Sequence, residues 1–368
     1  MKILHISGAK GWGGNEQQMI DLIPEFTNLG VNNIVFGVEN SQLQKECESR
    51  NISFVIAKKT KLNKSANYSY LKTIVKELKP DLIHLHTSDS LTVFTVSDLI
   101  YGLKVKTVFS KKGMGESGSF LSKFKYNYSG VNSFFCVSRS VEKDFSKILY
   151  EKNKFKTNVI HDCVSLDILN SKEVIDLRDK FAVNKDCFIV GNIANHTRAK
   201  DLDTFINVVD YVVNELGRKD IVFFQIGEFS KLTSNLLEIV KEKELGNSIF
   251  FTGKIENASS LNRQFDVFLM TSQREGGPTS VLEAMLIGAP IVSTNVGVIP
   301  DIIQNGSNGF IAPIKDYKVL AKKIDLLLLD ENLQKKFISE SKSIIEKEFI
   351  VSRIANQTLM EYKKILNL

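Results

Sequence analysis

The chain has 368 residues, of which 43% are hydrophobic and 24% charged, and its formal net charge at pH 7 is +6. This length fits two domains of roughly 100–200 residues each, and the composition excludes a disordered chain. No apolar run approaches the roughly 18 residues of a membrane span, and the N-terminus lacks the pattern of a signal peptide, so we expect a cytoplasmic protein. The four cysteines are scattered without metal spacing, which indicates reduced, buried thiols.

Short apolar runs alternate with segments of helical spacing twice along the chain. In the first half the expected strands are 2–6, 33–38, 54–57, 81–86, 106–110, 133–138 and 158–161, with helices such as 15–29 and 70–78 between them. The pattern restarts near Asp186 with strands 187–193, 220–227, 248–253, 267–272 and 290–294. Continuous apolar strands separated by helices indicate parallel sheets covered on both faces. We therefore predict an α/β protein with two Rossmann-like, doubly wound sheets and a junction near 165–185.

The first strand leads into a glycine-rich loop, "HISGAKGWGGNEQQ". Gly8, Gly11 and Gly14 fit the G-x-x-G-x-x-G spacing of nicotinamide-dependent nucleotide-sugar epimerases and dehydratases, and they also fit a turn that leaves room for a sugar substrate. Glu39 follows the second strand where a ribose-binding acid would lie, and Tyr150 and Lys154 form Y-x-x-x-K. An epimerase with one Rossmann sheet does not account for the second complete sheet, so we favour the substrate loop and keep the epimerase as the alternative.

The most informative segment is "TSQREGGPTSVLEAMLIGAPIVSTNVG", residues 271–297. A loop with Glu275, Gly276 and Gly277 follows a strand, and a helix is expected to open near Pro278, a residue type well suited to a first helical position. The amides of Thr279 and Ser280 would then be donors at a positive helix end, which is a natural seat for phosphate. Glu283 lies one turn into that helix, and a carboxylate accepting two hydrogen bonds suits the diol of a ribose.

Residues 275–316 closely resemble the donor-binding segment of family-4 (group 1) retaining glycosyltransferases with the GT-B fold, whose pattern runs E-G-x-P-x-x-x-x-E-A-M. The resemblance extends more weakly over nearly the whole chain, through "GGNEQQ", "VIHDCVSLD", "ANHTRAKDLDTFI" and the C-terminal "EFIVSRIANQTLMEYKKIL". It implies two domains facing across a cleft. These are an N-terminal acceptor-side domain, 1–168 with a returning helix of about 352–368, and a C-terminal nucleotide-sugar domain, 169–351.

The resemblance also implies the roles of site residues. Glu283 would hold the ribose hydroxyls, Glu275 would contact the transferred sugar, and Lys200 with Arg198 would neutralise the leaving diphosphate. No metal or other cofactor is expected, because cations, amides and a helix end supply the positive field. The leaving phosphate itself would help to take the acceptor's proton. The remaining predicted donor-binding residues are Gly276, Gly277, Pro278, Thr279, Ser280, Gly253 and, from the first domain, Gly13 and Gly14.

The chain departs from the family pattern at three places. Thr197 and Asn192 stand where many relatives carry an arginine, which is why Arg198 is assigned as the partner of Lys200. Lys112 stands where many relatives carry a histidine after the fifth strand. Asp162 and Cys163 replace the usual N-G turn and receive no role.

Other polar residues have two interpretations each. His84 and His86 point to the same face of a strand end and could form a metal pair, but the sequence offers no third ligand nearby. Asp201 and Asp203 form D-x-D, a metal signature elsewhere, although at a helix start they are expected to cap it. The residues assigned to the acceptor side are His86, Lys112, Glu16 and Trp12.

Positive charge is concentrated between Lys104 and Lys156, where the sequence has twelve Lys or Arg and four acidic residues. Such a stretch can attract an anionic membrane surface or a phosphorylated substrate, whereas no nucleic-acid motif is present. We predict a retaining, metal-independent glycosyltransferase that uses a nucleotide diphospho-sugar, UDP being the commonest. The expected acceptor is a glycan or lipid-linked acceptor of envelope or polysaccharide biosynthesis, and the expected location is the cytoplasm, peripherally on the inner membrane face. A non-catalytic sugar-nucleotide-binding protein is the remaining alternative.

Overall fold

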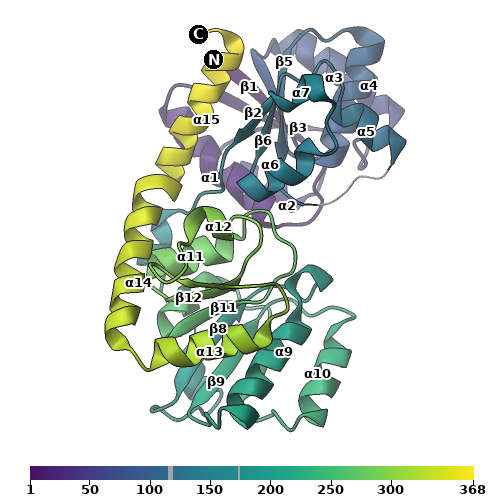
Figure 1. Cartoon of the computed structure of the whole chain (residues 1–368). Helices are drawn as coiled ribbons and strands as arrows, with labels where there is room; N and C mark the ends of the chain where they lie inside the picture. Colours follow the sequence, from purple (N-terminus) through teal and green to yellow (C-terminus); the bar gives the residue numbers. More distant parts are fainter. Residues whose placement is uncertain (115–118, 173–174) are drawn as a thin grey trace. The chain divides into compact units, whose positions relative to one another are not determined.

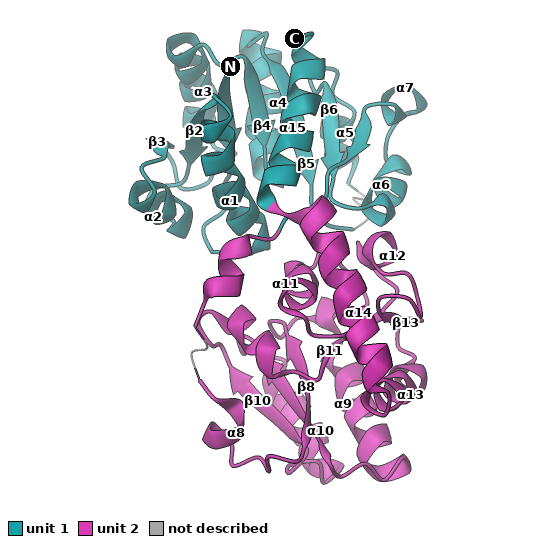
Figure 2. Ribbon diagram, turned by 90° about the vertical axis from the view of Figure 1, so that its left-hand side faces the viewer, with its two compact units in different colours: residues 1–163, 351–368 teal, residues 164–350 magenta. Residues whose placement is uncertain are grey.

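The structure is a computed structural model that describes residues 1–114, 119–172 and 175–368. The chain forms two compact units, one of residues 1–163 with 351–368 and one of residues 164–350 (Figure 2). The sequence-based boundaries at 168 and 351 lie further along the chain than the observed ones at 163 and 350.

The first unit is built on a parallel sheet with strand order β3-β2-β1-β4-β5-β6-β7 (Figure 1). Its strands are β1 (Lys2–Ile6), β2 (Asn32–Gly37), β3 (Ser53–Ile56), β4 (Leu82–Leu85), β5 (Lys106–Lys111), β6 (Ser133–Cys136) and β7 (Thr157–Val159). Its helices are α1 (Gly14–Asn28), α2 (Gln42–Ser49), α3 (Ser65–Leu78), α4 (Ser88–Tyr101), α5 (Phe120–Tyr126), α6 (Arg139–Ser146), α7 (Glu151–Lys154) and α15 (Val351–Leu366).

The second unit is a parallel sheet with strand order β10-β9-β8-β11-β12-β13. Its strands are β8 (Phe188–Ile193), β9 (Ile221–Ile226), β10 (Ile249–Gly253), β11 (Val267–Met270), β12 (Ile291–Thr294) and β13 (Phe310–Ala312). Its α-helices are α8 (Leu177–Lys180), α9 (Leu202–Asp210), α10 (Thr233–Glu242), α11 (Thr279–Ile287), α12 (Ile299–Ile302), α13 (Tyr317–Leu328) and α14 (Glu331–Ile344). Short 3-10 or π turns are η1 (Leu166–Asn170), η2 (Arg198–Lys200), η3 (Tyr211–Glu215), η4 (Ala258–Gln264) and η5 (Ile345–Phe349).

The prediction of two parallel sheets is confirmed, and a strand lies at each of the twelve expected positions. The central strands β1, β4, β8 and β11 are almost entirely buried, as continuous apolar runs require when helices cover both faces. The sequence analysis missed β13, because its three residues are too few to show a period. Among the described residues no helix is both long and apolar enough to span a bilayer.

The C-terminal helix α15 completes the core of the first unit. Its residues Ile354, Ala355, Leu359 and Tyr362 are buried in one cluster with Ile3, Phe26, Leu82, Val108 and Phe135. It lies beside α1, whose Phe26 belongs to the same cluster (Figure 1). Burial of these side chains, each contributing about 1.5–3 kcal/mol when large and apolar, explains why residues from the far end of the chain belong to this unit.

Candidate functional site

Three loops of the second unit meet beside Glu275. They follow β8, β11 and β12, which are neighbours in the sheet. Because all three strands are parallel, their carboxyl ends lie at one edge, and this is where open α/β sheets bind ligands. The first loop carries η2 with Lys200, the second carries Glu275, and the third carries Gly297.

Glu275 is held by two donors. Lys200 Nζ donates to Glu275 Oε1 at 2.6 Å, and the Ser272 hydroxyl donates to the same oxygen at 2.7 Å. The side chains of Lys200 and Glu275 are 24% and 11% exposed, so the pair is largely shielded from water. Both contacts use Oε1, which leaves Oε2 as the oxygen able to accept from a ligand hydroxyl. The sequence analysis paired neither Lys200 nor Ser272 with Glu275, because the first lies 75 residues away along the chain.

Three hydrogen bonds to main-chain carbonyls hold the Lys200 loop against the Glu275 loop. The Gln273 amide donates to Ala199 O at 2.9 Å, and Gln273 Nε2 donates to Arg198 O at 2.6 Å. The Thr271 hydroxyl donates to Lys200 O at 3.2 Å. The Lys200–Glu275 pair therefore rests on backbone that is fixed from both sides, as a preorganised site needs.

The prediction of a helix that opens near Pro278 is confirmed. Thr279 is the first residue of α11, and Pro278 precedes it with φ −70° and ψ 99°. Pro278 O accepts from the Val281 amide at 3.1 Å, which fixes the first turn. The amides of Thr279 and Ser280 belong to the helix end whose N–H groups have no intrahelical acceptor. Glu283, half-buried, follows one turn later.

Gly297 brings the third loop against the Glu275 loop. Its φ is +61°, and a Cβ built on it would lie 2.8 Å from Gly276 O and 2.9 Å from Glu275 Cβ. Gly276 is buried and Gly277 half-buried at this contact. Glycine is therefore required here for both its backbone conformation and its lack of a side chain.

Arg198 and Gly253 were also predicted as donor-site residues, but neither belongs to the Lys200–Glu275–Ser272 cluster. Arg198 is exposed and lines a hollow of the second unit with Asp203, Lys231 and Gln273, and within the described residues no bond joins its guanidinium to Glu275. Gly253 ends β10 with φ +76°, and its carbonyl accepts from the Gly227 amide at 3.1 Å. The structure thus brings Lys200, but not the Arg198 side chain, into the carboxylate cluster.

The D-x-D pair lies where expected but does not cap as expected. Asp201 is the residue before α9, with φ 49°, and its carboxylate makes no capping bond to a backbone amide. It accepts from the Thr204 hydroxyl at 2.9 Å instead. The capping prediction for Asp201 was therefore wrong in its mechanism, because the left-handed backbone turns the carboxylate toward a side-chain hydroxyl. Asp203 lies in the first turn, where an acid complements the helix dipole.

In the first unit, the glycine loop leads into the N-terminus of α1. Gly13 precedes the helix, and Gly14 is its first residue. Asn15 Nδ2 donates to His86 O and to Glu16 Oε1, both at 3.2 Å, so Glu16 and His86 are joined through one side chain. Burial raises the pKa of Glu16 above its usual value. Trp12 is 38% exposed at the loop and is accessible to a ligand.

Lys112 is paired with Asp162, a residue to which the sequence analysis gave no role. Lys112 Nζ donates to Asp162 Oδ1 at 2.5 Å, and the Asp162 side chain is only 7% exposed. The two residues follow β5 and β7, which lie on either side of β6 in the sheet, an order that the sequence pattern could not give. Lys112 is therefore a half-buried, neutralised cation rather than a solvent-facing one.

His84 and His86 have a histidine neighbour that the sequence analysis did not find. His5 on β1 accompanies them, since β1 pairs with β4 and His5 is in register with His84. All three are buried, with exposures of 1%, 5% and 8% for His5, His84 and His86. The expectation that no third ligand lies nearby was wrong. They line a cavity of about 30 Å³ in the first unit, together with Asn15, Gln18, Lys112 and Tyr362.

The Y-x-x-x-K match does not form a catalytic pair. Tyr150 precedes the short helix α7, and Lys154 Nζ pairs with Glu151 Oε2 at 2.7 Å on the surface. This removes one of the sequence matches on which the epimerase alternative rested, and the complete second sheet is the further argument against it.

Comparison with known proteins agrees with this arrangement. Residues 174–344, which hold all the second-unit site residues named above, match the family model of glycosyl transferases group 1. The second unit is a group 1 glycosyltransferase domain. Beyond that domain, the whole chain has the GT-B fold of a solved structure, Anabaena Alr3699/HepE in complex with UDP and glucose. That structure superposes with a TM-score of 0.83 at 18% identity, over 99% of this chain and 100% of the other.

Two glycosyltransferase relatives match beyond the group 1 domain. The O-antigen biosynthesis glycosyltransferase WclY of Escherichia coli is 22% identical over 100% of this chain and 98% of its own length. N-acetyl-alpha-D-glucosaminyl L-malate synthase of Bacillus anthracis is 22% identical over 78% of this chain and 75% of its own length. Their names describe different reactions at the same identity, so the substrates of one relative do not carry over to this chain.

Proposed function

We propose that this protein is a retaining glycosyltransferase that moves a sugar from a UDP-sugar to a glycan or lipid-linked acceptor of envelope polysaccharide biosynthesis. The observation that carries the proposal is the Lys200–Glu275–Ser272 cluster beside the N-terminus of α11, inside the group 1 domain. Similarity to a structure that holds UDP and glucose supports a uridine nucleotide, and similarity to an O-antigen enzyme supports an envelope glycan.

The proposed mechanism separates binding from charge neutralisation. The α11 amides and the Gly276–Gly277 backbone bind the diphosphate, and Glu283 accepts from the ribose diol. Glu275 Oε2 accepts from a hydroxyl of the transferred sugar, while Lys200 and Ser272 hold Oε1. As the sugar leaves, negative charge develops on the diphosphate, and Lys200 lies within reach of that loop to stabilise it. Arg198 adds a second cation from the same 3-10 turn.

The leaving phosphate takes the proton of the acceptor hydroxyl, so no protein base is required on the attacking side. The new glycosidic bond forms on the face from which the diphosphate departs, which retains the anomeric configuration. Nuclear magnetic resonance of the isolated product distinguishes this outcome from inversion. Because lysine and amides supply the positive charge, we propose that UDP binding needs no metal, and that EDTA leaves the affinity for UDP unchanged.

The deciding experiment compares two lysines of the second unit. Lys200→Met removes the cation beside Glu275. Lys243→Met removes a cation that is paired with Asp210 at 2.5 Å and is 32% exposed, outside the cluster. With a panel of UDP-, GDP- and ADP-sugars, we expect Lys200→Met to lower the release of nucleotide diphosphate about 10²–10³-fold, the range for loss of one transition-state donor. Lys243→Met keeps the wild-type rate. Equal rates in the two variants, or no nucleotide release by the wild type, would contradict the proposal.

The same experiment decides between catalysis and binding alone. A non-catalytic sugar-nucleotide-binding protein would show calorimetric binding of UDP-sugars without release of free nucleotide. An active enzyme releases it slowly even without acceptor, because water substitutes for the acceptor hydroxyl.

We also propose that the first unit binds an anionic membrane surface through α5. Phe120 and Leu121 are 80% and 74% exposed, and the exposed Lys123 lies on the same helix. Exposed apolar side chains beside a lysine fit the boundary of an acidic bilayer, where the apolar side chains enter and the cation meets lipid phosphate. Co-sedimentation with phosphatidylglycerol vesicles should be lost in a Phe120→Ser, Leu121→Ser double variant. Retention in that variant, or equal binding to neutral vesicles, would refute it.

A further inference from the structure

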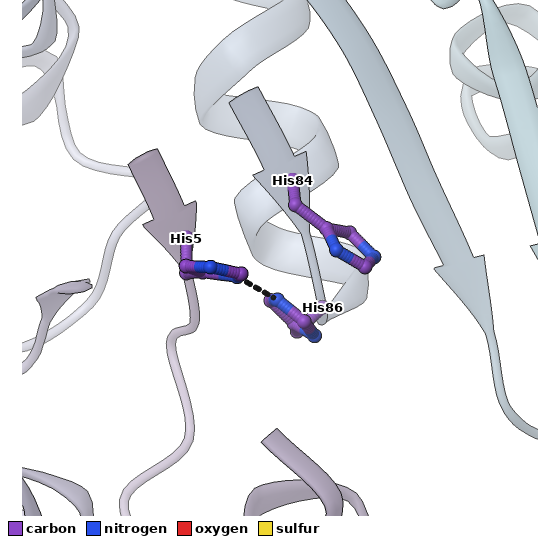
Figure 3. A group of neighbouring side chains, drawn as sticks. All are labelled: His5, His84 and His86. Carbon is purple, nitrogen blue, oxygen red and sulfur yellow. Dashed lines mark hydrogen bonds between the residues drawn. The ribbon is translucent and has the colours of Figure 1, made fainter. Parts of the chain in front are cut away.

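The first unit holds three buried histidines that lie close together. His5 projects from β1, His84 from β4 and His86 from the residue after β4, and the His5 ring points toward His86 (Figure 3). One nitrogen from each ring lies within 4.8 Å of the other two. His5 Nδ1 and His86 Nε2 are only 3.0 Å apart and share a hydrogen bond.

This spacing is close to that of ligands on one metal ion. Zn–N bonds of about 2.0–2.1 Å at tetrahedral angles place two ligand nitrogens roughly 3.3 Å apart. The 3.0 Å between His5 and His86 therefore needs little change when a metal replaces the shared proton. His84 must come closer, and its ring, which is bonded to Tyr362 and Ser110 and lies with its centroid 4.0 Å from that of His86, must rotate to do so.

The rings are in the protonation state that a metal requires. Burial lowers the pKa of His5 to about 4 and lowers the pKa values of His84 and His86 well below the usual range. Neutral imidazole has a lone pair for a metal, whereas the imidazolium has none. At neutral pH each ring is therefore neutral, and only the proton that His5 and His86 share must leave the position that the ion would take.

Neighbouring polar groups hydrogen-bond to the histidine rings and orient them, as the groups around metal-bound histidines do. Asn33 Oδ1 lies 3.1 Å from His5 Nε2, which holds Nδ1 toward the cluster. His84 has hydroxyl partners at both nitrogens, Tyr362 Oη at 2.5 Å and Ser110 Oγ at 2.8 Å. A hydroxyl can donate or accept, so one of them can accept the ring N–H while the other makes way for the ion.

The charges around the cluster tolerate a cation. Lys112 is near enough to lower the pKa values of His84 and His86, but it is paired with Asp162 at 2.5 Å. Glu16 adds a further carboxyl, joined to the His86 carbonyl through Asn15. The cavity of about 30 Å³ that the histidines line is large enough for one water, which would fill a fourth ligand position.

We propose that His5, His84 and His86 form a binding site for one zinc-like divalent transition metal ion, with a water from the adjoining cavity as fourth ligand. Imidazole ligands and a tetrahedral set favour Zn²⁺ and admit Co²⁺ as a spectroscopic probe. The site lies in the first unit and does not depend on the proposed transfer reaction, whose donor residues are in the second.

The test uses the untagged full-length chain, stripped with EDTA and titrated with Co²⁺ and then Zn²⁺. The wild type should bind one ion per chain, with the visible absorption of four-coordinate cobalt, and Zn²⁺ should displace it and raise the melting temperature. His86→Ala, at the least buried of the three positions, should bind at least 100-fold more weakly. His5→Gln serves as a second ligand variant should His86→Ala fold poorly, with circular dichroism as the check.

Two further variants separate a ligand role from a general effect. His196→Gln removes a buried histidine that is bonded to Gln225 and Thr233 in the second unit, and it should bind Co²⁺ as the wild type does. Asn33→Leu keeps all three histidines but removes the acceptor of the His5 ring, and it should weaken binding about 10–100-fold. The proposal is overturned if the wild type binds no stoichiometric Co²⁺ or Zn²⁺, if the ligand variants bind like the wild type, or if His196→Gln loses the ion.

Discussion

Gly297→Ala is expected to damage the donor site without removing any functional group. The residue has φ +61°, and the added methyl would lie 2.8 Å from Gly276 O and 2.9 Å from Glu275 Cβ. A comfortable carbon contact is about 3.5–4.0 Å, so the Glu275 loop must retreat by roughly 1 Å. The left-handed backbone costs a further 1–2 kcal/mol or so with a side chain present.

The consequence for function follows from that displacement. A shift of about 1 Å in a site-forming loop can cost on the order of 10²-fold in rate, because the substrate no longer meets its partners at hydrogen-bond distance. We therefore expect Gly297→Ala to lower UDP-sugar turnover about 10²-fold, to weaken UDP binding, and to lower the free energy of unfolding by at least 1–2 kcal/mol.

Gly306→Ala is the matched control. Gly306 has φ +80° in the same unit, and a Cβ there would meet nothing within 4 Å. Backbone strain should lower the free energy of unfolding of this variant by about the same 1–2 kcal/mol, while its affinity for UDP stays that of the wild type. Urea unfolding measures the first quantity and titration calorimetry the second. If both variants bound UDP and turned over the sugar nucleotide alike, the Glu275 loop would not be the donor site.

Three further predictions concern binding, pH and packing. Glu283→Ala should weaken UDP binding by about 1.5–3 kcal/mol through loss of the ribose acceptor, and unchanged calorimetric affinity would exclude that role. The pKa of His5 falls from about 6.5 unfolded to about 4 folded, so its contribution to stability is present above pH 6.5 and is lost as pH drops toward 4, roughly 3 kcal/mol in all. In EDTA, His5→Asn should accordingly flatten the dependence of urea unfolding on pH in that window, and an unaltered slope would contradict the assignment. Gly191→Ala places a methyl group 2.2 Å from the Phe265 ring and should lower the free energy of unfolding by about 1–3 kcal/mol or somewhat more. Gly246→Ala meets nothing within 4 Å and should leave thermal unfolding nearly unchanged.

The local patterns of the chain were sufficient for the fold class. Buried parallel strands need continuous apolar runs, and covering helices need apolar residues at helical spacing. Each element can therefore be predicted from a few consecutive residues. The loop of Glu275, Gly276 and Gly277 before α11 was recognisable for the same reason, since a strand–loop–helix unit is contiguous. The wrong cap at Asp201 arose because φ and ψ at a helix start depend on packing as well as on residue type.

The contacts that make the sites were decided by tertiary structure alone. Lys200 reaches Glu275 across 75 residues, and His5 reaches His86 across 81, because β8 lies beside β11 and β1 beside β4 in the sheets. Strand order depends on which apolar faces pack against each other. It therefore cannot be predicted from a short stretch of the sequence. The elements were therefore determined by the sequence directly, whereas the partners of their side chains were determined by the way the strands assemble.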